Sequence, residues 1–271
     1  MENGIHFISG LPRSGSTLLA SLLRQNPRFH AAMTSPVSNV FMATQASLSG
    51  RNEFHVFLND TQRMAILRGI FAGFYADVHQ QKTIFDTNRT WCSKLGSLTQ
   101  LFPQAKVICC VRNLAWIVDS FERLIRKNAF QLSRIFNFEP GGNVYTRTET
   151  LTGTNGVVRV AIDGLREAFY GEQASRLILV TYESLARRPA KTLDAIYDFV
   201  GERPFTHDFE HVEYDADEYD ERMGTPGLHK VASRVAFVER PTILPPDLFG
   251  KLQQSAFWLE PEQNPGNVRI V

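Results

Sequence analysis

Four short apolar runs recur along the chain, separated by longer segments in which apolar residues follow a helical period. The runs cover residues 5–9, 82–85, 107–111 and 177–181. Each run is continuous rather than alternating, which is typical of parallel strands buried on both faces of a sheet. The pattern therefore predicts four strands of a parallel sheet, for which we expect five strands in all.

Helical patterns fill the segments between these runs. Leucines form a stripe in residues 17–23, and a longer helix, capped by Asp60 or Thr61, is expected to reach Val78. Similar spacing recurs in residues 117–125, and a last helix is expected to run from Pro246 through Phe257. Strands that alternate with helices connect by right-handed crossovers. The expected fold class is α/β, with a parallel sheet covered by helices on both faces.

Two stretches follow neither period. Residues 137–156 are rich in Gly, Asn, Thr and Glu and are predicted to form a long loop. Loops of this length in a compact domain are usually functional, so this one is a candidate lid. Residues 207–222 carry eight acidic side chains, which are most often a solvated face and are otherwise a site for a cationic acceptor.

Composition limits the class of protein. The chain has 271 residues, of which 43% are apolar and 21% charged, as in an ordinary globular protein. This length suits one domain over residues 1–271, with core strands within 5–200 and a closing segment at 201–271. No apolar run approaches the ~18 residues that cross a bilayer, so no membrane span is expected. The formal net charge of +1 argues against nucleic acid as a partner.

The three cysteines point to a compartment. Cys92, Cys109 and Cys110 have neither a disulfide framework nor zinc spacing, and an odd count fits a reducing environment. The first residues also lack the basic and apolar regions of a secretory signal. A cytoplasmic protein is therefore expected.

The first apolar run leads directly into Gly-Leu-Pro-Arg-Ser-Gly-Ser-Thr at residues 10–17, and a helical segment follows. A strand, a glycine-bearing turn and a helix N-terminus together hold phosphate, because backbone N–H groups and the helix dipole both favour negative charge there. Gly15 allows close approach, and Ser14, Ser16 and Thr17 add hydroxyl groups. The alternative is a plain turn with a Ser or Thr N-cap, but the cluster of hydroxyls beside an Arg favours an anion site.

This loop lacks the features of a magnesium-dependent nucleotide site. A kinase or NTPase loop has Lys where this chain has Ser16, and a neighbouring strand that ends in Asp to hold Mg²⁺. Here the third predicted strand ends at Arg112, a cation that would repel a metal ion. The sequence thus predicts a phosphate cradle that requires no metal, suited to a transferred group with less charge than a γ-phosphate, such as a sulfonate.

These residues resemble the sulfotransferases that use 3′-phosphoadenosine 5′-phosphosulfate (PAPS). The 5′-phosphosulfate loop of that family reads Pro-[Lys/Arg]-[Ser/Cys]-Gly-[Ser/Thr]-Thr, and residues 12–17 match it in the Arg form typical of the bacterial and tyrosylprotein branches. An Arg at a strand end with a Ser eight residues later matches Arg112 and Ser120, which implies that both bind the 3′-phosphate. A Tyr-Glu pair after a late strand matches Tyr182 and implies contact with the nucleoside. The resemblance spans roughly residues 5–260.

The resemblance implies a P-loop-type parallel core, PAPS as donor and 3′-phosphoadenosine 5′-phosphate (PAP) as product. Arg13 would stabilise charge between the sulfonate and the leaving 5′-phosphate. Lys230, in a late basic stretch, is a candidate clamp over the phosphates, although exposed basic loop residues are an equal alternative. The expected donor-binding residues are Arg13, Ser14, Gly15, Ser16, Thr17, Arg112, Ser120, Tyr182 and Lys230.

The general base is missing from both positions where branches of the family carry one. Cytosolic members have a His where this chain has Asn88, and the tyrosylprotein branch has a Glu in the region of residues 33–36. Asp86, at the carboxyl edge of the second predicted strand, is the candidate base, with Arg89 to neutralise the sulfonate. The alternative is that Asp86 caps the following helix and pairs with Arg89.

Two histidines are weaker base candidates, His30 and His229, since a lone His is more often structural. The expected reaction moves a sulfonate from PAPS to a hydroxyl, or less favourably an amine, of a small molecule, sugar, lipid or peptide. An atypical kinase using ATP and Mg²⁺ and a nucleotide-binding module without catalysis are the two alternatives. The identity of the acceptor and the formation of a homodimer stay open at this point.

Overall fold

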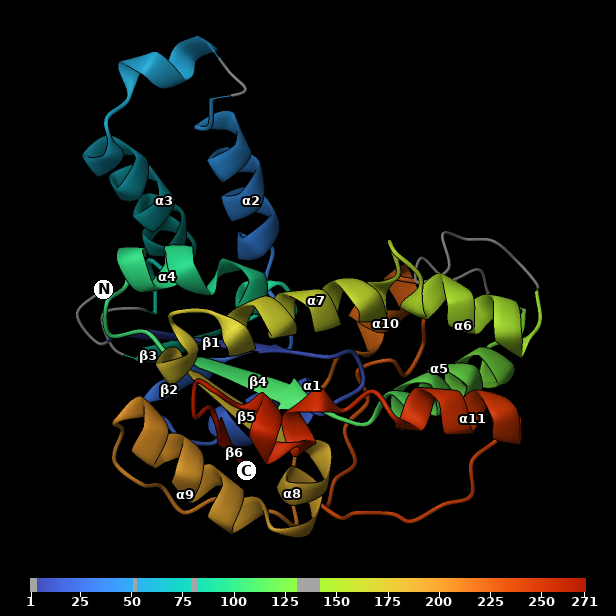
Figure 1. Cartoon of the computed structure of the whole chain (residues 1–271). Helices are drawn as coiled ribbons and strands as arrows, with labels where there is room; N and C mark the ends of the chain where they lie inside the picture. Colours follow the sequence, from blue (N-terminus) through green and yellow to red (C-terminus); the bar gives the residue numbers. More distant parts are fainter. Residues whose placement is uncertain (1–3, 51–52, 79–81, 131–141) are drawn as a thin grey trace.

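The structure is a computed structural model that describes residues 4–50, 53–78, 82–130 and 142–271. Within these residues, six strands form one sheet in the order β2-β3-β1-β4-β5-β6, and every neighbouring pair is parallel (Figure 1). The strands are β1 (Ile5–Gly10), β2 (Phe29–Ala31), β3 (Thr83–Thr87), β4 (Val107–Val111), β5 (Leu177–Thr181) and β6 (Arg269–Ile270).

The four strands predicted from the apolar runs are confirmed, as β1, β3, β4 and β5. The expectation of five strands was wrong by one. The two remaining strands lie at the edges of the sheet, and at three and two residues they are too short to give a recognisable hydrophobic pattern.

Helices cover both faces of the sheet, which confirms the α/β class. Successive strand residues face opposite sides, so Ile8 and Ile108 pack with α1, α8 and α9, whereas Phe7 and Val107 pack with α3, α4, α5 and α7. The α-helices within the described residues are α1 (Ser16–Leu23), α2 (Val37–Ser47), α3 (Asp60–Phe74), α4 (Leu95–Leu101), α5 (Leu114–Lys127), α6 (Val144–Thr152), α7 (Val157–Tyr170), α8 (Tyr182–Arg187), α9 (Pro189–Val200), α10 (Asp217–Arg222) and α11 (Pro246–Gln253).

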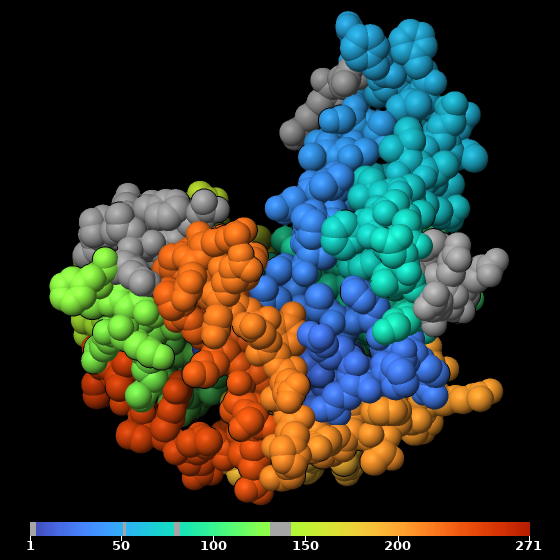
Figure 2. Space-filling view, turned by 180° about the vertical axis from the view of Figure 1, so that it is seen from behind, coloured from blue at the N-terminus to red at the C-terminus, as the bar shows by residue number. Residues whose placement is uncertain are grey.

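Helices α2 and α3 pack along each other as an arm that stands away from the sheet (Figures 1 and 2). Helix α3 begins at Asp60, and its N-cap is Asn59 instead of the expected Asp60 or Thr61. The Asn59 side chain accepts a hydrogen bond from the backbone N–H of Gln62. The helix ends at Phe74, four residues before the predicted end at Val78. The base of the arm is the part of it nearest the functional site described below.

Two predictions about local structure were wrong. Helix α6 forms inside the predicted loop, because the Asn143 side chain caps the backbone N–H groups of Tyr145 and Thr146 and because Leu151 is buried. Residues 137–141 of that loop lie outside the described part of the chain. Helix α11 ends at Gln253 instead of continuing through Phe257, since the Ser255 hydroxyl takes the carbonyl of Leu252 (2.6 Å) that a further turn would use.

Among the described residues, no helix has both the length and the apolar character that crossing a bilayer requires.

Candidate functional site

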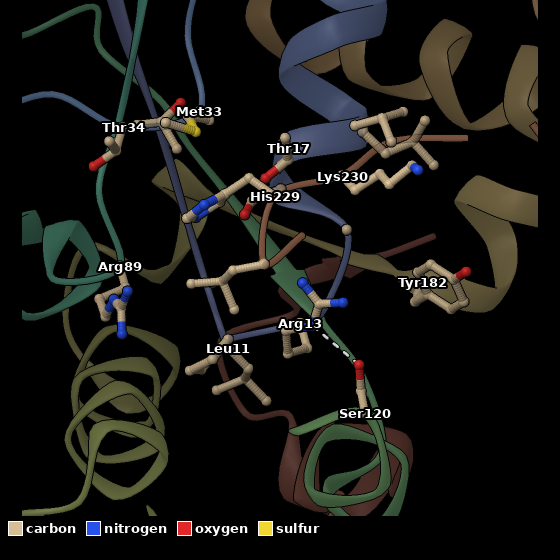
Figure 3. Close-up of a pocket in the computed structure, with 18 of the residues that line it drawn as sticks. Leu11, Arg13, Thr17, Met33, Thr34, Arg89, Ser120, Tyr182, His229 and Lys230 are labelled. Atoms are coloured by element: carbon tan, nitrogen blue, oxygen red, sulfur yellow. Dashed lines mark hydrogen bonds between the residues drawn. The ribbon is translucent and has the colours of Figure 1, made fainter. Parts of the chain in front are cut away.

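A cavity of about 770 Å³ opens at the carboxyl ends of β1, β3, β4 and β5 (Figure 3). This edge of a parallel sheet is where ligands of open α/β folds bind, and the volume suits a nucleotide-sized molecule. The phosphate loop (residues 10–17) forms its centre, and residues from 228–236 of the C-terminal segment line it as well. Neighbouring strands lie about 4.8 Å apart. Since β1 lies between β3 and β4, the ends of β3 and β4 are two such spacings apart.

The backbone of the phosphate loop adopts three unusual conformations. Gly10 has φ +151°, and a Cβ there would lie 2.5 Å from the carbonyl oxygen of Cys110, so only glycine fits. Gly15 (φ +97°) and Arg13 (φ +60°) lie in the left-handed region. After Gly15 the chain enters α1, and no side chain caps the first N–H groups of this helix. The loop therefore has the conformation expected of an anion cradle.

The hydroxyl groups of the loop do not all face the cavity. Gly15, Ser16 and Thr17 line it, as expected. Ser14 is buried, and its hydroxyl lies 2.5 Å from the carbonyl oxygen of Leu11 and 2.8 Å from that of Cys110. The structure thus corrects the expectation of a Ser14 hydroxyl donor: this side chain fixes the loop to β4, and only its backbone is left for a ligand.

The four residues Arg13, Arg112, Ser120 and Tyr182 converge on one end of the cavity, here called the β4 side. Arg13 donates from Nε to the Ser120 hydroxyl (3.0 Å), and Arg112 donates from Nη1 to the Arg13 carbonyl (3.4 Å). The Arg112 guanidinium also stacks on the Tyr182 ring, with Cζ 4.1 Å from the ring centre. The eight-residue spacing from Arg112 to Ser120 thus brings both to one place, because Ser120 lies in the second turn of α5.

Positive charge on the β4 side is only partly balanced, because Asp220 acts on Arg13 and Glu183 acts on Arg112, while the two guanidinium groups repel each other. Burial and the neighbouring charge of Arg112 lower the pKa of Arg13 to about 10. Burial also lowers the pKa of Arg112, and its Nε is buried with no partner among the described residues. Two guanidinium groups held close together and left short of acceptors are the expected environment of an anion site.

Lys230 lies at the mouth of the same region. Its side chain is exposed and lines the cavity above the phosphate loop, near Thr17 in Figure 3. The position fits a clamp, but an exposed ammonium group contributes less to binding than a buried guanidinium.

The opposite end of the cavity, here called the β3 side, is lined by Met33, Thr34, Asn88 and Arg89. Arg89 follows the end of β3, and its guanidinium has no hydrogen-bond partner among the described residues. The side chain is accessible to solvent, yet burial lowers its pKa, a combination that arises when a group projects into a cavity. In Figure 3, Arg89 lies well apart from Arg13 and Ser120.

Asp86 does not line the cavity, which corrects its expected role as base. Its two carboxylate oxygens accept hydrogen bonds from the Ser35 hydroxyl (2.7 Å), the Tyr75 hydroxyl (2.6 Å) and the Trp91 indole (2.7 Å). Burial raises the pKa of the Asp86 carboxyl, and these three donors oppose the rise. Asp86 neither pairs with Arg89 nor caps a helix; it joins the base of the arm to the sheet.

A histidine and a buried aspartate form a pair on the cavity wall. The Nδ1 atom of His229 lies 2.5 Å from Oδ1 of Asp220, and the backbone N–H of His229 donates to Oδ2 (2.7 Å). Asp220 is fully buried on α10, whereas His229 lines the cavity. The rings of Tyr219 and His229 meet edge to face, with centres 5.6 Å apart.

Asp220 and Tyr219 were missed in the sequence, where the acidic stretch was interpreted as a solvated face. No local pattern marked Asp220 as buried among the acidic residues around it. The other member of the pair, His229, was considered only as a weaker candidate. Within the part of the chain that the structure describes, no group of three or more His, Cys, Asp or Glu side chains is arranged to hold a metal ion.

Comparison with known proteins gives a consistent family. A sequence model described as the sulfotransferase family matches residues 6–207. The nodulation protein NoeE of Sinorhizobium fredii is 27% identical over 220 residues, which cover 74% of this chain and 50% of NoeE, so the chain spans about half the length of that curated relative.

One solved structure is similar in fold over nearly the whole chain, and a second gives a weaker match. The sulfotransferase domain from the curacin biosynthetic pathway is 21% identical, with a TM-score of 0.52 and coverage of 96% of this chain and 94% of that domain. The sulfotransferase domain of the Synechococcus PCC 7002 olefin synthase is 23% identical, with a TM-score of 0.49 and 93% coverage of both chains.

Proposed function

The chain belongs to the sulfotransferase family, and we propose that it transfers a sulfonate group from PAPS to a hydroxyl group of an acceptor. The observation that carries this proposal is the convergence, in one cavity, of the phosphate loop with Arg112, Ser120 and Tyr182. The spacing of these residues along the chain matches the donor signatures of the family, and the fold brings them together.

The β4 side fits a doubly phosphorylated adenosine. The phosphate loop supplies backbone N–H groups and the Ser16 and Thr17 hydroxyls for the 5′-phosphosulfate. Arg112, whose buried Nε lacks a partner among the described residues, and Ser120 would bind the 3′-phosphate. A second anion at this end would relieve the repulsion between the Arg112 and Arg13 guanidinium groups. Tyr182 would pack against the nucleoside.

The residues of the cavity supply what a sulfonyl transfer requires. Bound PAPS supplies the sulfonate and, as leaving group, the 5′-phosphate of PAP. Arg13 and the N-terminus of α1 stabilise negative charge that develops on that phosphate. Arg89 stabilises the sulfonate from the β3 side, and Lys230 closes the mouth over the phosphates. Since none of these roles needs a divalent ion, the transfer proceeds without Mg²⁺.

The acceptor is proposed as a hydroxyl compound, with an amine as the less favoured class. The β3 side, which would face the acceptor, combines apolar, hydroxyl and cationic side chains in Met33, Thr34 and Arg89. The three cysteines are free and buried, which fits a protein of the cytoplasm.

A transfer assay with two donors tests the proposal. The protein is incubated with ³⁵S-labelled PAPS or with γ-labelled ATP and Mg²⁺, each with a panel of alcohols, phenols, sugars and amines. Label transfer from PAPS in the presence of EDTA is the expected result. Transfer from ATP with Mg²⁺ and none from PAPS would establish a kinase instead, and tight PAP binding with no transfer to any acceptor would indicate a binding module.

A further inference from the structure

We propose that His229 is the general base of the transfer and that Asp220 is the residue that positions it. This inference rests on the proposed function. It assigns the general base, which this sequence lacks at both positions where branches of the family carry one. A hydroxyl acceptor must lose its proton as its oxygen attacks, so a base within reach of the cavity is required.

The hydrogen bonds of Asp220 fix the orientation of the imidazole. Both carboxylate oxygens are used by His229, one by Nδ1 and the other by the backbone N–H. The Asp220 side chain is 1% exposed and cannot exchange these bonds for water, whereas that of His229 is 17% exposed and lines the cavity. A carboxylate bound to Nδ1 selects the tautomer with its proton there and leaves the lone pair on Nε2.

The position of His229 is central in the cavity. Figure 3 shows its ring between the phosphate loop, with Arg13 and Thr17, and the β3 side, with Thr34 and Arg89. Its electrostatics agree with this placement, because the charges of both Arg13 and Arg89 act on the imidazole. An acceptor that enters from the β3 side would therefore pass the His229 ring on its way to the anion cradle.

The surroundings keep the imidazole neutral at neutral pH. Burial lowers the pKa of His229, Arg13 and Arg89 lower it further, and Asp220 opposes them. Tyr219 on α10 packs against the ring, and the adjacent Lys230, together with Arg234 and Arg112, lines the same cavity. A base must be unprotonated to act, so the rate is expected to rise with pH through the lowered pKa of His229 and to level off above it.

The proton and electron balance of the step is simple. Nε2 of His229 takes the proton of the acceptor hydroxyl while the acceptor oxygen forms a bond to sulfur. The bond from sulfur to the 5′-phosphate oxygen breaks, and its electron pair leaves with PAP. The imidazolium, stabilised by Asp220, then returns the proton to solvent, so the sum is sulfated acceptor, PAP and one proton.

The other candidates for the base do not reach the reaction site. Asp86 is committed to three donors beneath the arm. His30 is not among the residues that line the cavity, and its ring packs edge to face against Tyr75 (5.5 Å between centres).

His229→Gln and Asp220→Asn test the assignment, with His211→Gln as a matched control. His211 also pairs with an aspartate through Nδ1 (Asp208, 3.0 Å), but that pair lies on the surface, with side chains 82% and 54% exposed. The rate at which PAP is released from PAPS is measured as a function of pH. The acceptor is a compound that is sulfated in the transfer assay described above or, where none is, water. We expect His229→Gln to lower turnover by roughly 10²–10⁴-fold and to remove the rising limb of the pH profile.

Two further readouts separate a base from a merely structural residue. Calorimetry with PAP should give the same affinity for wild type and both variants. Imidazole ¹⁵N NMR should show His229 of the free wild type with its proton on Nδ1, and this preference should weaken in Asp220→Asn. The rising limb of the pH profile of Asp220→Asn should shift to lower pH, because the variant lacks the negative charge that raises the pKa of His229. His211→Gln should leave all three readouts unchanged.

Each outcome decides the assignment. If the wild type binds PAP and is active while His229→Gln keeps its rate and its pH limb, the base lies elsewhere and the proposed function stands. If the NMR spectra place the proton on Nε2, the orientation by Asp220 is wrong. If the wild type neither binds PAP nor releases it from PAPS, the proposed function fails and the base assignment falls with it.

Discussion

The ends of β3 and β4 flank the phosphate loop on opposite sides, and each carries a charged residue, yet the two side chains have different fates. Arg112 follows the last residue of β4 and lines the cavity. Asp86 lies inside β3, on the same face as Ile84, and points under the helices of the arm. Arg112 can face the cavity because it lies beyond the last residue of its strand. Asp86 lies within β3, where alternation assigns its side chain to one face of the sheet.

The largest effect expected from this comparison is on stability. Asp86→Ala would remove the buried carboxylate that accepts hydrogen bonds from Ser35, Tyr75 and Trp91, at a cost of roughly 3–5 kcal/mol in the free energy of unfolding. Asp86→Asn, which keeps one acceptor oxygen, should cost less and retain turnover where the protein is folded. Urea denaturation and an assay of the folded variant check this; a stable Asp86→Asn protein with abolished turnover would restore Asp86 as the base.

Arg112→Ala should act on the nucleotide instead. Loss of charged hydrogen bonds to the 3′-phosphate is worth about 2–3 kcal/mol, or roughly 10²-fold in PAP affinity. The affinity for adenosine 5′-monophosphate, which lacks that phosphate, should change far less. Arg187→Ala is the control, because Arg187 also stacks on a ring (Phe237, 3.9 Å) but does not line the cavity. Equal weakening of both nucleotides by Arg112→Ala would refute the assignment.

Arg89→Gln is expected to change turnover more than donor affinity. Arg89 lies on the β3 side, remote from Ser120 in Figure 3, so PAP affinity should stay within about twofold of wild type. Loss of a cation near the sulfonate should lower turnover by about tenfold, close to 1.4 kcal/mol. Calorimetry and steady-state rates test both parts, and a large loss of PAP affinity would place Arg89 with the nucleotide.

Lys230→Ala should have the smallest effect of the series. The ammonium group is exposed, so its loss should weaken PAP binding by less than about fivefold, and added salt should reduce that difference further. A loss comparable with that of Arg112→Ala would show that the C-terminal segment closes tightly over the donor.

The sequence predicted which residues meet on the β4 side of the cavity better than it predicted the rest, because the positions of these residues follow local rules. A glycine-bearing turn that follows one buried strand and an Arg that follows the neighbouring strand lie at the same edge of any parallel sheet. The side-chain direction of Ser14 was not predictable, since it depends on the nearby Cys110 carbonyl in β4.

The His229–Asp220 pair depends on tertiary structure in another way. Its members are nine residues apart in a segment without regular hydrophobic period, and the two lie beyond residue 207, where the family match ends. Nothing local distinguishes Asp220 from its exposed acidic neighbours. The pair forms because α10 buries one face and the chain then returns over the phosphate loop, an arrangement that only the folded structure reveals.

The central claim is that one cavity holds both phosphates of an adenosine 3′,5′-nucleotide without a divalent ion. Calorimetric titration of the wild-type protein with PAP and with adenosine 5′-monophosphate, both in EDTA, tests it directly. PAP is expected to bind, at least about tenfold more tightly than the monophosphate. No binding of PAP, or affinities that are equal for the two nucleotides, would contradict the account.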